Sequence, residues 1–213
     1  MRSKVTIQPA VEPVTLAEVK SSLKITSTAA DALLSQMIVD ARIYAERFTG
    51  KKFISQTITS YYDSLSGHAD IEWFSGNRKG AVTQLGGTSA ILEFGPAQSI
   101  TTVHTIDDDN SETLYAASNY YLDHFDDDLR PQLRLNSGSS MTWTRDENGV
   151  KIVYIAGYGD AATDVPSPIR RSINLLVGHM YANRGDCGDK CSSDCGAMPL
   201  LDSYRFENTS GLR

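Results

Sequence analysis

The spacing of hydrophobic residues changes twice along the chain. Apolar positions recur every three to four residues up to about residue 50, and again after residue 166. Between them, short runs rich in β-branched and aromatic residues alternate with turn signals. Helices and strands have these two periods, so the pattern predicts an α+β fold. We expect a small helical bundle, made of N-terminal helices and a late C-terminal helix, with an inserted antiparallel β-sandwich or barrel-like domain.

This pattern divides the chain into four parts. Residues 1–52 form an N-terminal arm and the first helices of the helical core, and residues 53–157 form the inserted all-β domain. Residues 158–185 carry the returning helix, and residues 186–213 are a cysteine-containing loop and a C-terminal tail. Residues 1–13 fit either a short edge strand or a frayed terminus.

Two helices are predicted in the first part. Thr15 and Glu18 have the spacing of a capping box, and this helix should end near Lys24. The second helix follows Ser27, with Thr28 as its N-cap and Gly50 in the left-handed position after its end. One apolar stripe runs along it: Leu34, Met37, Ile38, Ala41, Tyr44, Ala45 and Phe48.

The middle part contains eight short strand candidates without intervening helices, which is typical of a sandwich or a small barrel. They cover residues 53–62, 71–74, 90–94, 100–106, 120–123, 132–135, 141–144 and 150–155. Asn148-Gly149 is a tight-hairpin signal before the last of them.

The last helix is expected after Pro166, with Ser167 as N-cap, Pro168 at the first helical position and Gly185 at its end. Its apolar face should pack on the stripe of the second helix. Gly157-Tyr158-Gly159, just before it, lacks the Lys-Ser/Thr of a phosphate loop and more simply permits a sharp bend.

Composition and charge argue against two classes of protein: those that wrap DNA and those that span a membrane. The 213 residues carry a net charge of −6, whereas a protein that wraps DNA is usually basic. No window has the roughly 18 apolar residues of a membrane span, and the N-terminus lacks the apolar core of a signal peptide. We therefore expect a protein made in a cytoplasm, with no membrane partner.

Cys187, Cys191 and Cys195 recur at every fourth position. A structural zinc site needs four ligands, so a fourth would have to come from elsewhere, such as His179. The incomplete set favours a plain loop with free thiols over zinc, and a disulfide is a third interpretation. No metal or cofactor is predicted.

The sequence also contains no recognisable set of catalytic residues. Residues 107–109 and 126–128 are aspartate runs that do not match a calcium loop, and they are predicted to be solvated turns. The four histidines lie in no nucleophile motif.

Arg170 and Arg171 lie in the first turn of the last helix, where the helix dipole disfavours cations. Two interpretations stay open. Either these arginines form salt bridges with Asp160 or Asp164, or they face an acidic partner surface.

The order of several segments resembles the head–tail connector (adaptor, or head-completion) proteins of long-tailed double-stranded-DNA phages. The resemblance runs from about residue 12 to residue 206. Its carriers are residues 12–20, 23–25, 41–51, 56–57, 120–123, 153–159, 165–169 and 180–184. It implies a non-enzymatic virion protein that forms a ring, usually twelve-fold, under the portal. The ring would extend the DNA channel and offer a platform to a tail-side neck, stopper or tail-terminator protein.

The resemblance implies that Arg170 and Arg171 belong to a portal or ring interface. The apolar tail would dock on the portal through Leu200, Leu201, Tyr204, Arg205 and Phe206. Deleting residues 198–213 should then leave a folded protein. Genomic DNA would pass through the lumen without sequence-specific binding, in a particle assembled in the bacterial host cytoplasm. Alternatives are another neck or tail-completion protein, a carbohydrate-binding module using Trp73 and Trp143, and, weakest, an enzyme.

Overall fold

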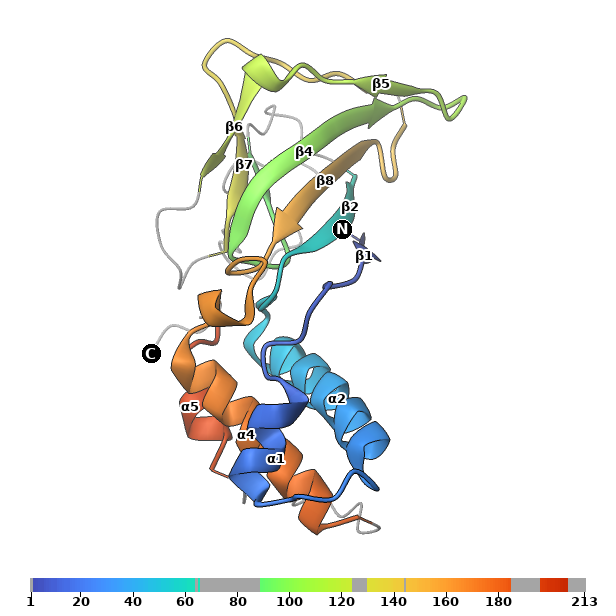
Figure 1. Ribbon diagram of the computed structural model, residues 1–213. Helices are drawn as coiled ribbons and strands as arrows, with labels where there is room; N and C mark the ends of the chain where they lie inside the picture. The colour runs from blue at the N-terminus through green and yellow to red at the C-terminus, as the bar shows by residue number, and fades with distance from the viewer. Residues whose placement is uncertain are drawn as a thin grey trace, which may run out of the picture. The chain divides into compact units, whose positions relative to one another are not determined.

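The computed structural model describes residues 2–63, 65, 89–123, 130–143, 145–184 and 196–206, and the structural statements below concern these residues. They form two compact units (Figure 1). The β unit comprises Met1–Gln8 and Gln56–Ala156, and the helical unit comprises Pro9–Ser55 and Gly157–Arg213. Each unit is built from segments far apart in the sequence.

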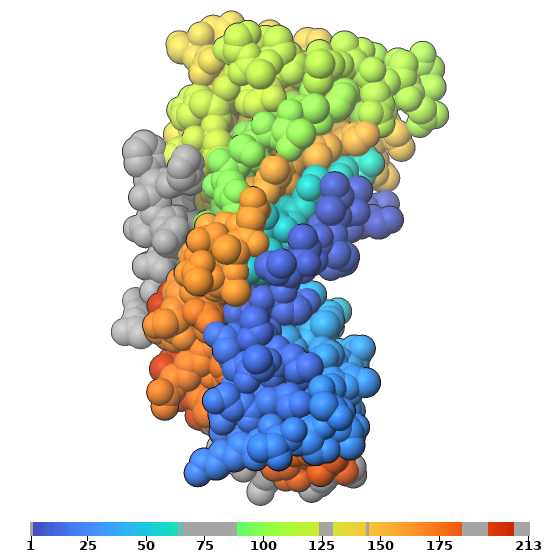
Figure 2. All heavy atoms as spheres, in the orientation of Figure 1, coloured from blue at the N-terminus to red at the C-terminus, as the bar shows by residue number. Residues whose placement is uncertain are grey.

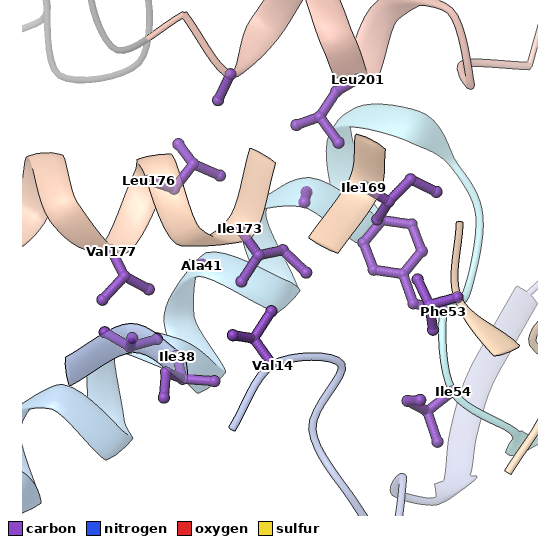
Figure 3. Packing of buried hydrophobic residues seen from close by; sticks show 14 of the residues in the cluster. Val14, Ile38, Ala41, Phe53, Ile54, Ile169, Ile173, Leu176, Val177 and Leu201 are labelled. Carbon is purple, nitrogen blue, oxygen red and sulfur yellow. The ribbon is translucent and has the colours of Figure 1, made fainter. Parts of the chain in front are cut away.

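The helical unit is a bundle around one apolar core, as the spacing predicted. Its helices are α1 (Leu16–Leu23), α2 (Asp31–Thr49), α4 (Ser167–Ala182) and the short α5 (Met198–Asp202), with a 3-10 turn at Ala162–Asp164. Figure 3 shows Ile38 of α2 and Ile173 of α4 pointing toward a common centre with Val14. Leu201 of α5 joins the same core, so the C-terminal segment is part of the bundle.

The predicted start of α1 is confirmed in detail. The Thr15 hydroxyl accepts a hydrogen bond from the Glu18 amide at 3.2 Å. The Thr15 amide donates in return to Glu18 Oε2 at 2.7 Å. Lys24 follows the helix in the left-handed conformation, with φ of 56°. Gly50 likewise ends α2 with φ of 73°, as expected for a residue without Cβ.

Two other predicted caps are wrong. α2 begins at Asp31 after Ala30, and no side chain caps it; the Thr28 carbonyl accepts from the Asp31 amide instead. In α4, Ser167 is already helical, since Pro166 stands at the N-cap. α4 also ends at Ala182 rather than at Gly185. Local capping preferences of about 1 kcal/mol are readily overridden by the packing of the helix.

The β unit contains two antiparallel sheets, and neither closes into a barrel. The five-stranded sheet has the order β1-β2-β8-β4-β5, and the three-stranded sheet has the order β3-β7-β6. The strands are β1 (Arg2–Ile7), β2 (Gln56–Tyr62), β3 (Ser89–Ile91), β4 (Ala97–Ile106), β5 (Glu112–Leu114), β6 (Tyr120–Asp123), β7 (Gln132–Leu135) and β8 (Val150–Ala156). Ile58 and Ile152 of one sheet share a core with Leu133 of the other.

Sequence and structure differ at three places in this unit. β5 (Glu112–Leu114) is a strand that the sequence pattern did not predict. The N-terminal arm, which the pattern grouped with the helical core, pairs with β2 as an edge strand and so lies in the β unit. Residues 141–143 form no strand, so Asn148-Gly149 does not close a hairpin there. The strand candidate at 71–74 lies outside the described residues.

Two buried tyrosines join the sheets. Tyr62 of β2 donates to the Ile91 carbonyl of β3 at 2.7 Å, and Tyr154 of β8 accepts from the Phe94 amide at 3.2 Å. Burial raises the pKa of both phenols, to about 12 for Tyr154. Both groups therefore stay neutral, and the hydrogen bonds hold over the physiological pH range.

Candidate functional site

An apolar groove lies on the outer side of α4. Its floor is the face of α4 opposite the core, and its walls come from the end of α1 and from α5. We call it the α4 groove; it has a volume of about 910 Å³ and is lined by Ser22, Leu23, Ser167, Pro168, Arg170, Arg171, Asn174, Leu175, Gly178, His179 and Leu200. On the face shown in Figure 2, α1 (blue) lies beside α4 (orange).

Arg170 is held within the protomer. Its Nη2 donates to Glu18 Oε1 of α1, and its Nε donates to the Pro13 carbonyl at 3.1 Å. The first of the two interpretations, a salt bridge to Asp160 or Asp164, does not hold for Arg170: its ion-pair partner is Glu18, and Asp164 accepts a hydrogen bond from the Ala161 amide. The pKa of Glu18 is lowered, first by its hydrogen bond from the Thr15 backbone and further by Arg170. Arg170 therefore joins α1 to α4.

Arg171 has a different environment. It is exposed at the groove, and it has no ion-pair partner within the part of the chain that the structure describes. A cation fixed on a helix beside apolar surface is suited to meet a carboxylate of another molecule. Sequence spacing alone could not separate Arg171 from its neighbour Arg170.

The tail residues divide into two groups. Leu201 and Phe206 are buried, and the Phe206 amide donates to the Thr49 carbonyl at 3.1 Å. The Lys51 ammonium stands 5.0 Å from the centre of the Phe206 ring. Leu200 and Tyr204 are half-buried, and Arg205 is exposed. Because two apolar anchors fill the protomer's own core, we expect the deletion of residues 198–213 to destabilise the helical unit.

A buried ionic cluster supports the same unit, and the sequence pattern did not reveal it. Arg42 of α2, 4% exposed, donates to Glu12 at 2.7 Å and lies 3.4 Å from Glu46. Glu46, 3% exposed, also accepts from Lys52 at 2.9 Å. The only sequence signal is the i,i+4 spacing of Arg42 and Glu46, which is equally common on solvated faces.

The outer side of α2 forms a second apolar surface. It presents Leu33, Ile43 and Tyr44, which are 41%, 37% and 36% exposed. With Gln36 and Asp40 these residues define what we call the α2 outer face. Tyr44 was expected in the buried stripe of the helix, but it lies at the edge of that stripe, where its hydroxyl stands 3.9 Å from Met198 Sδ.

The cysteine loop and one of the two aspartate runs singled out in the sequence lie in parts of the chain that the structure does not describe. Cys187, Cys191 and Cys195 lie outside the described residues, as does the aspartate run 126–128. Within the described parts no group of three metal-ligating side chains occurs, and none of the helices there is long and apolar enough to cross a membrane. Asp109 accepts from the Ser111 amide at 3.0 Å, which is the solvated turn expected of that run.

Comparison with known proteins bears on the family and on the fold. Residues 13–88, which include α1, α2 and β2, match the sequence profile described as phage gp6-like head-tail connector protein. No curated protein sequence gives a significant match. The sequence evidence for the family therefore lies in the first half of the chain.

Among solved structures, similar chains occur in gene transfer agent (GTA) particles. A chain in the neck of an empty GTA particle, computed with C6 symmetry, has 20% identity and a TM-score of 0.76, with 100% of both chains covered. A chain in the virion of a native GTA particle has 20% identity and a TM-score of 0.75, covering 100% of this chain and 99% of that one. A chain in the neck of a native particle, computed with C12 symmetry, has 21% identity and a TM-score of 0.66, with 99% of both chains covered.

These chains share the complete fold of both units. Head–tail connectors are structural and non-enzymatic, in agreement with the lack of a catalytic motif in the sequence. The resemblance seen in the sequence is confirmed over residues 13–88, which match the phage gp6-like head-tail connector family, while the likeness to the GTA chains supports the fold of the whole chain.

Proposed function

We propose that this connector forms a ring between the portal and the tail of a phage-like particle. The ring would extend the DNA channel and give the tail-side proteins a platform. The observation that carries the proposal is the family match at residues 13–88, to which the full-length likeness to GTA neck chains adds the fold. The protein would be made in the bacterial host cytoplasm and reside in the virion, at the head–tail junction.

A closed ring fits the symmetric settings in which those chains occur. The necks that contain them were computed with C6 and C12 symmetry. In a ring each copy uses one surface on one neighbour and a different surface on the other. We propose twelve copies for this protein, a number compatible with both symmetries.

The α4 groove is the surface we assign to assembly. Arg171, Leu200 and the accessible tail residues Tyr204 and Arg205 would contact the portal or a neighbouring copy. Arg170, Leu201 and Phe206 would act indirectly, since their contacts hold α1, α4 and α5 in place. The tail-side partner, a neck, stopper or tail-terminator protein, would meet another part of the ring.

The charge distribution supports DNA passage without tight binding. The β unit has 8 Lys and Arg residues against 14 Asp and Glu residues, and the helical unit has 12 of each. Neither unit is net basic, so neither has the excess of cations that replaces the counterions of DNA. DNA would slide through such a ring without being gripped.

The carbohydrate-binding alternative has little support. Trp143 is half-buried and packs against the core of the β unit, and Trp73 lies outside the described residues. A stacking platform for sugars needs an accessible ring face. A different neck or tail-completion role is the main rival.

Particles produced with and without this protein test the proposal. We expect electron microscopy to show a ring of this chain on the portal, and particles lacking it to be filled heads without tails. Purified portal should retain the wild-type protein in a pull-down. Normal tails in its absence, or a position at the far end of the tail, would overturn the proposal.

A further inference from the structure

The helical unit carries two apolar surfaces that face in opposite directions. α2 and α4 pack on each other through their buried faces, and Leu34 and Ile38 of α2 share one core with Ile173 and Val177 of α4. The α2 outer face is the other side of α2, and the α4 groove is the other side of α4. The two surfaces therefore point away from each other on one packed body.

These surfaces complement each other chemically. The α2 outer face offers a ridge of exposed Leu33, Ile43 and Tyr44. The α4 groove offers a concave surface, with Leu23, Leu175 and Leu200 among its lining residues. At Gly178 the groove floor has no side chain, and an added Cβ would stand 3.3 Å from Leu23 Cδ2, so the glycine lets Leu23 of α1 lie close against α4 and form a wall of the groove.

Their charges are complementary as well. The exposed Asp40 lies within the α2 outer face, where it accepts a hydrogen bond at 3.1 Å from the neutral amide of Gln36 and pairs with no cation among the described residues. Arg171 lies at the groove, also without an ion-pair partner in the described parts of the chain. A carboxylate on the ridge and a guanidinium at the groove would fix the register of the contact.

We propose that the occupant of the α4 groove is the α2 outer face of a second copy of this chain, with Asp40 of one copy beside Arg171 of the next. The inference rests on the ring proposed above and names the surfaces that would build it. Two different surfaces on opposite sides of one body give a head-to-tail contact, which closes into a ring when the rotation permits. α2 has 19 residues and is thus about 28 Å long, enough to cover the groove along its length.

Photo-crosslinking of the full chain tests this contact even where association is weak. The exposed Leu33 is replaced by p-benzoylphenylalanine, and the concentrated protein is illuminated. We expect a ladder of covalent multimers, because each copy offers one donor and one acceptor surface. Mass spectrometry should place the linked peptide in 167–179 or 198–202. The same probe at Tyr121, 47% exposed on the β unit, is the matched control and should not link to these peptides.

Charge exchange then tests the register. Arg171→Glu should lower the ladder yield about tenfold, and Asp40→Arg should do the same. The double variant Asp40→Arg/Arg171→Glu should recover most of the yield, because it restores an opposite-charge pair across the contact. If the single variants instead lost yield through a structural defect, the double variant would not recover it. Circular dichroism of all three variants checks that they fold.

The outcomes are distinct. Links from α2 to α2 would mean that like surfaces meet. Links to other peptides, or no links, would mean that the groove has another occupant such as the portal. Each of these results would overturn the inference. If the ladder forms but the protein is absent from the head–tail junction, the proposed function fails while the contact stands. If the wild-type protein is found in the neck but the ladder of multimers is absent, the proposed contact fails while the proposed function stands.

Discussion

Arg170 donates a hydrogen bond to Glu18, a residue 152 positions earlier in the chain, and so ties the first turn of α4 to the first turn of α1. Glu18 is also the N3 residue of the α1 capping box. One carboxylate thus serves a local cap and a long-range contact. This pairing explains why a cation is tolerated at the start of α4, where the helix dipole opposes it.

Glu18→Gln tests this relationship. Glutamine keeps the capping-box geometry but removes the charge, so we expect a loss of about 0.5 kcal/mol at pH 7. The folded pKa of Glu18 lies below its ordinary value of 4.5. The contribution is therefore fully present above that value and is lost as the pH falls through the folded pKa. Urea unfolding of both proteins at pH 7 and pH 3 should show the difference shrinking in acid; a constant difference would contradict the assignment.

Gly157→Ala should destabilise the helical unit by about 3 kcal/mol. Gly157 has φ of 144°, and an added Cβ would stand 2.6 Å from the backbone of Ile54 and Ser55. That backbone is held by hydrogen bonds from Tyr158 to Phe53 and from Ser55 to Gly159. Thermal unfolding measures the loss.

Gly138→Ala is the control for backbone strain alone. Gly138 also has a positive φ, 81°, but nothing lies within 4 Å of the place that an added Cβ would take. We expect a cost of about 1 kcal/mol there. Equal losses in the two variants would show that the close approach at Gly157 is unimportant.

Glu46→Ala should cost about 3–5 kcal/mol, because it leaves Arg42 buried without its partner on the same helix. Lys52 would lose its contact at the same time. Arg47→Ala, on the exposed side of α2, should change the free energy of unfolding by less than about 0.5 kcal/mol. The free energies of unfolding of the two variants, measured in guanidinium chloride, show whether the buried ionic cluster stabilises the protein.

Phe206→Ala should cost about 3 kcal/mol, since the ring is 5% exposed and packs against Gly50 and Lys51. Arg205→Ala removes only an exposed guanidinium 5.5 Å from the Phe48 ring, so it should cost below about 1 kcal/mol. A chain ending at Ala197 should unfold at a lower temperature than the full chain. An unchanged melting temperature would instead favour a tail that serves the portal alone.

The sequence by itself determined the elements whose signals are local. The Thr15/Glu18 capping box, the left-handed Gly50 and the alternation in β6, β7 and β8 depend on neighbours a few residues apart, and all appear in the structure. The order of these segments also predicted the resemblance to head–tail connectors, which the family match at residues 13–88 confirms for that part of the chain. The caps at Thr28 and Ser167 were misplaced because their local preference is small compared with the packing that positions the helix ends.

Only the tertiary structure decided which distant residues meet. It pairs Arg170 with Glu18 rather than with the nearer Asp160 or Asp164, and it places the N-terminal arm on β2. It also buries Leu201 and Phe206 in the core, while Arg171 stays free of ion pairs among the described residues. Charge and hydrophobicity are properties of single residues. Interaction partners and burial depend instead on which distant segments the tertiary fold brings together, and the spacing of residues along the sequence does not contain that information.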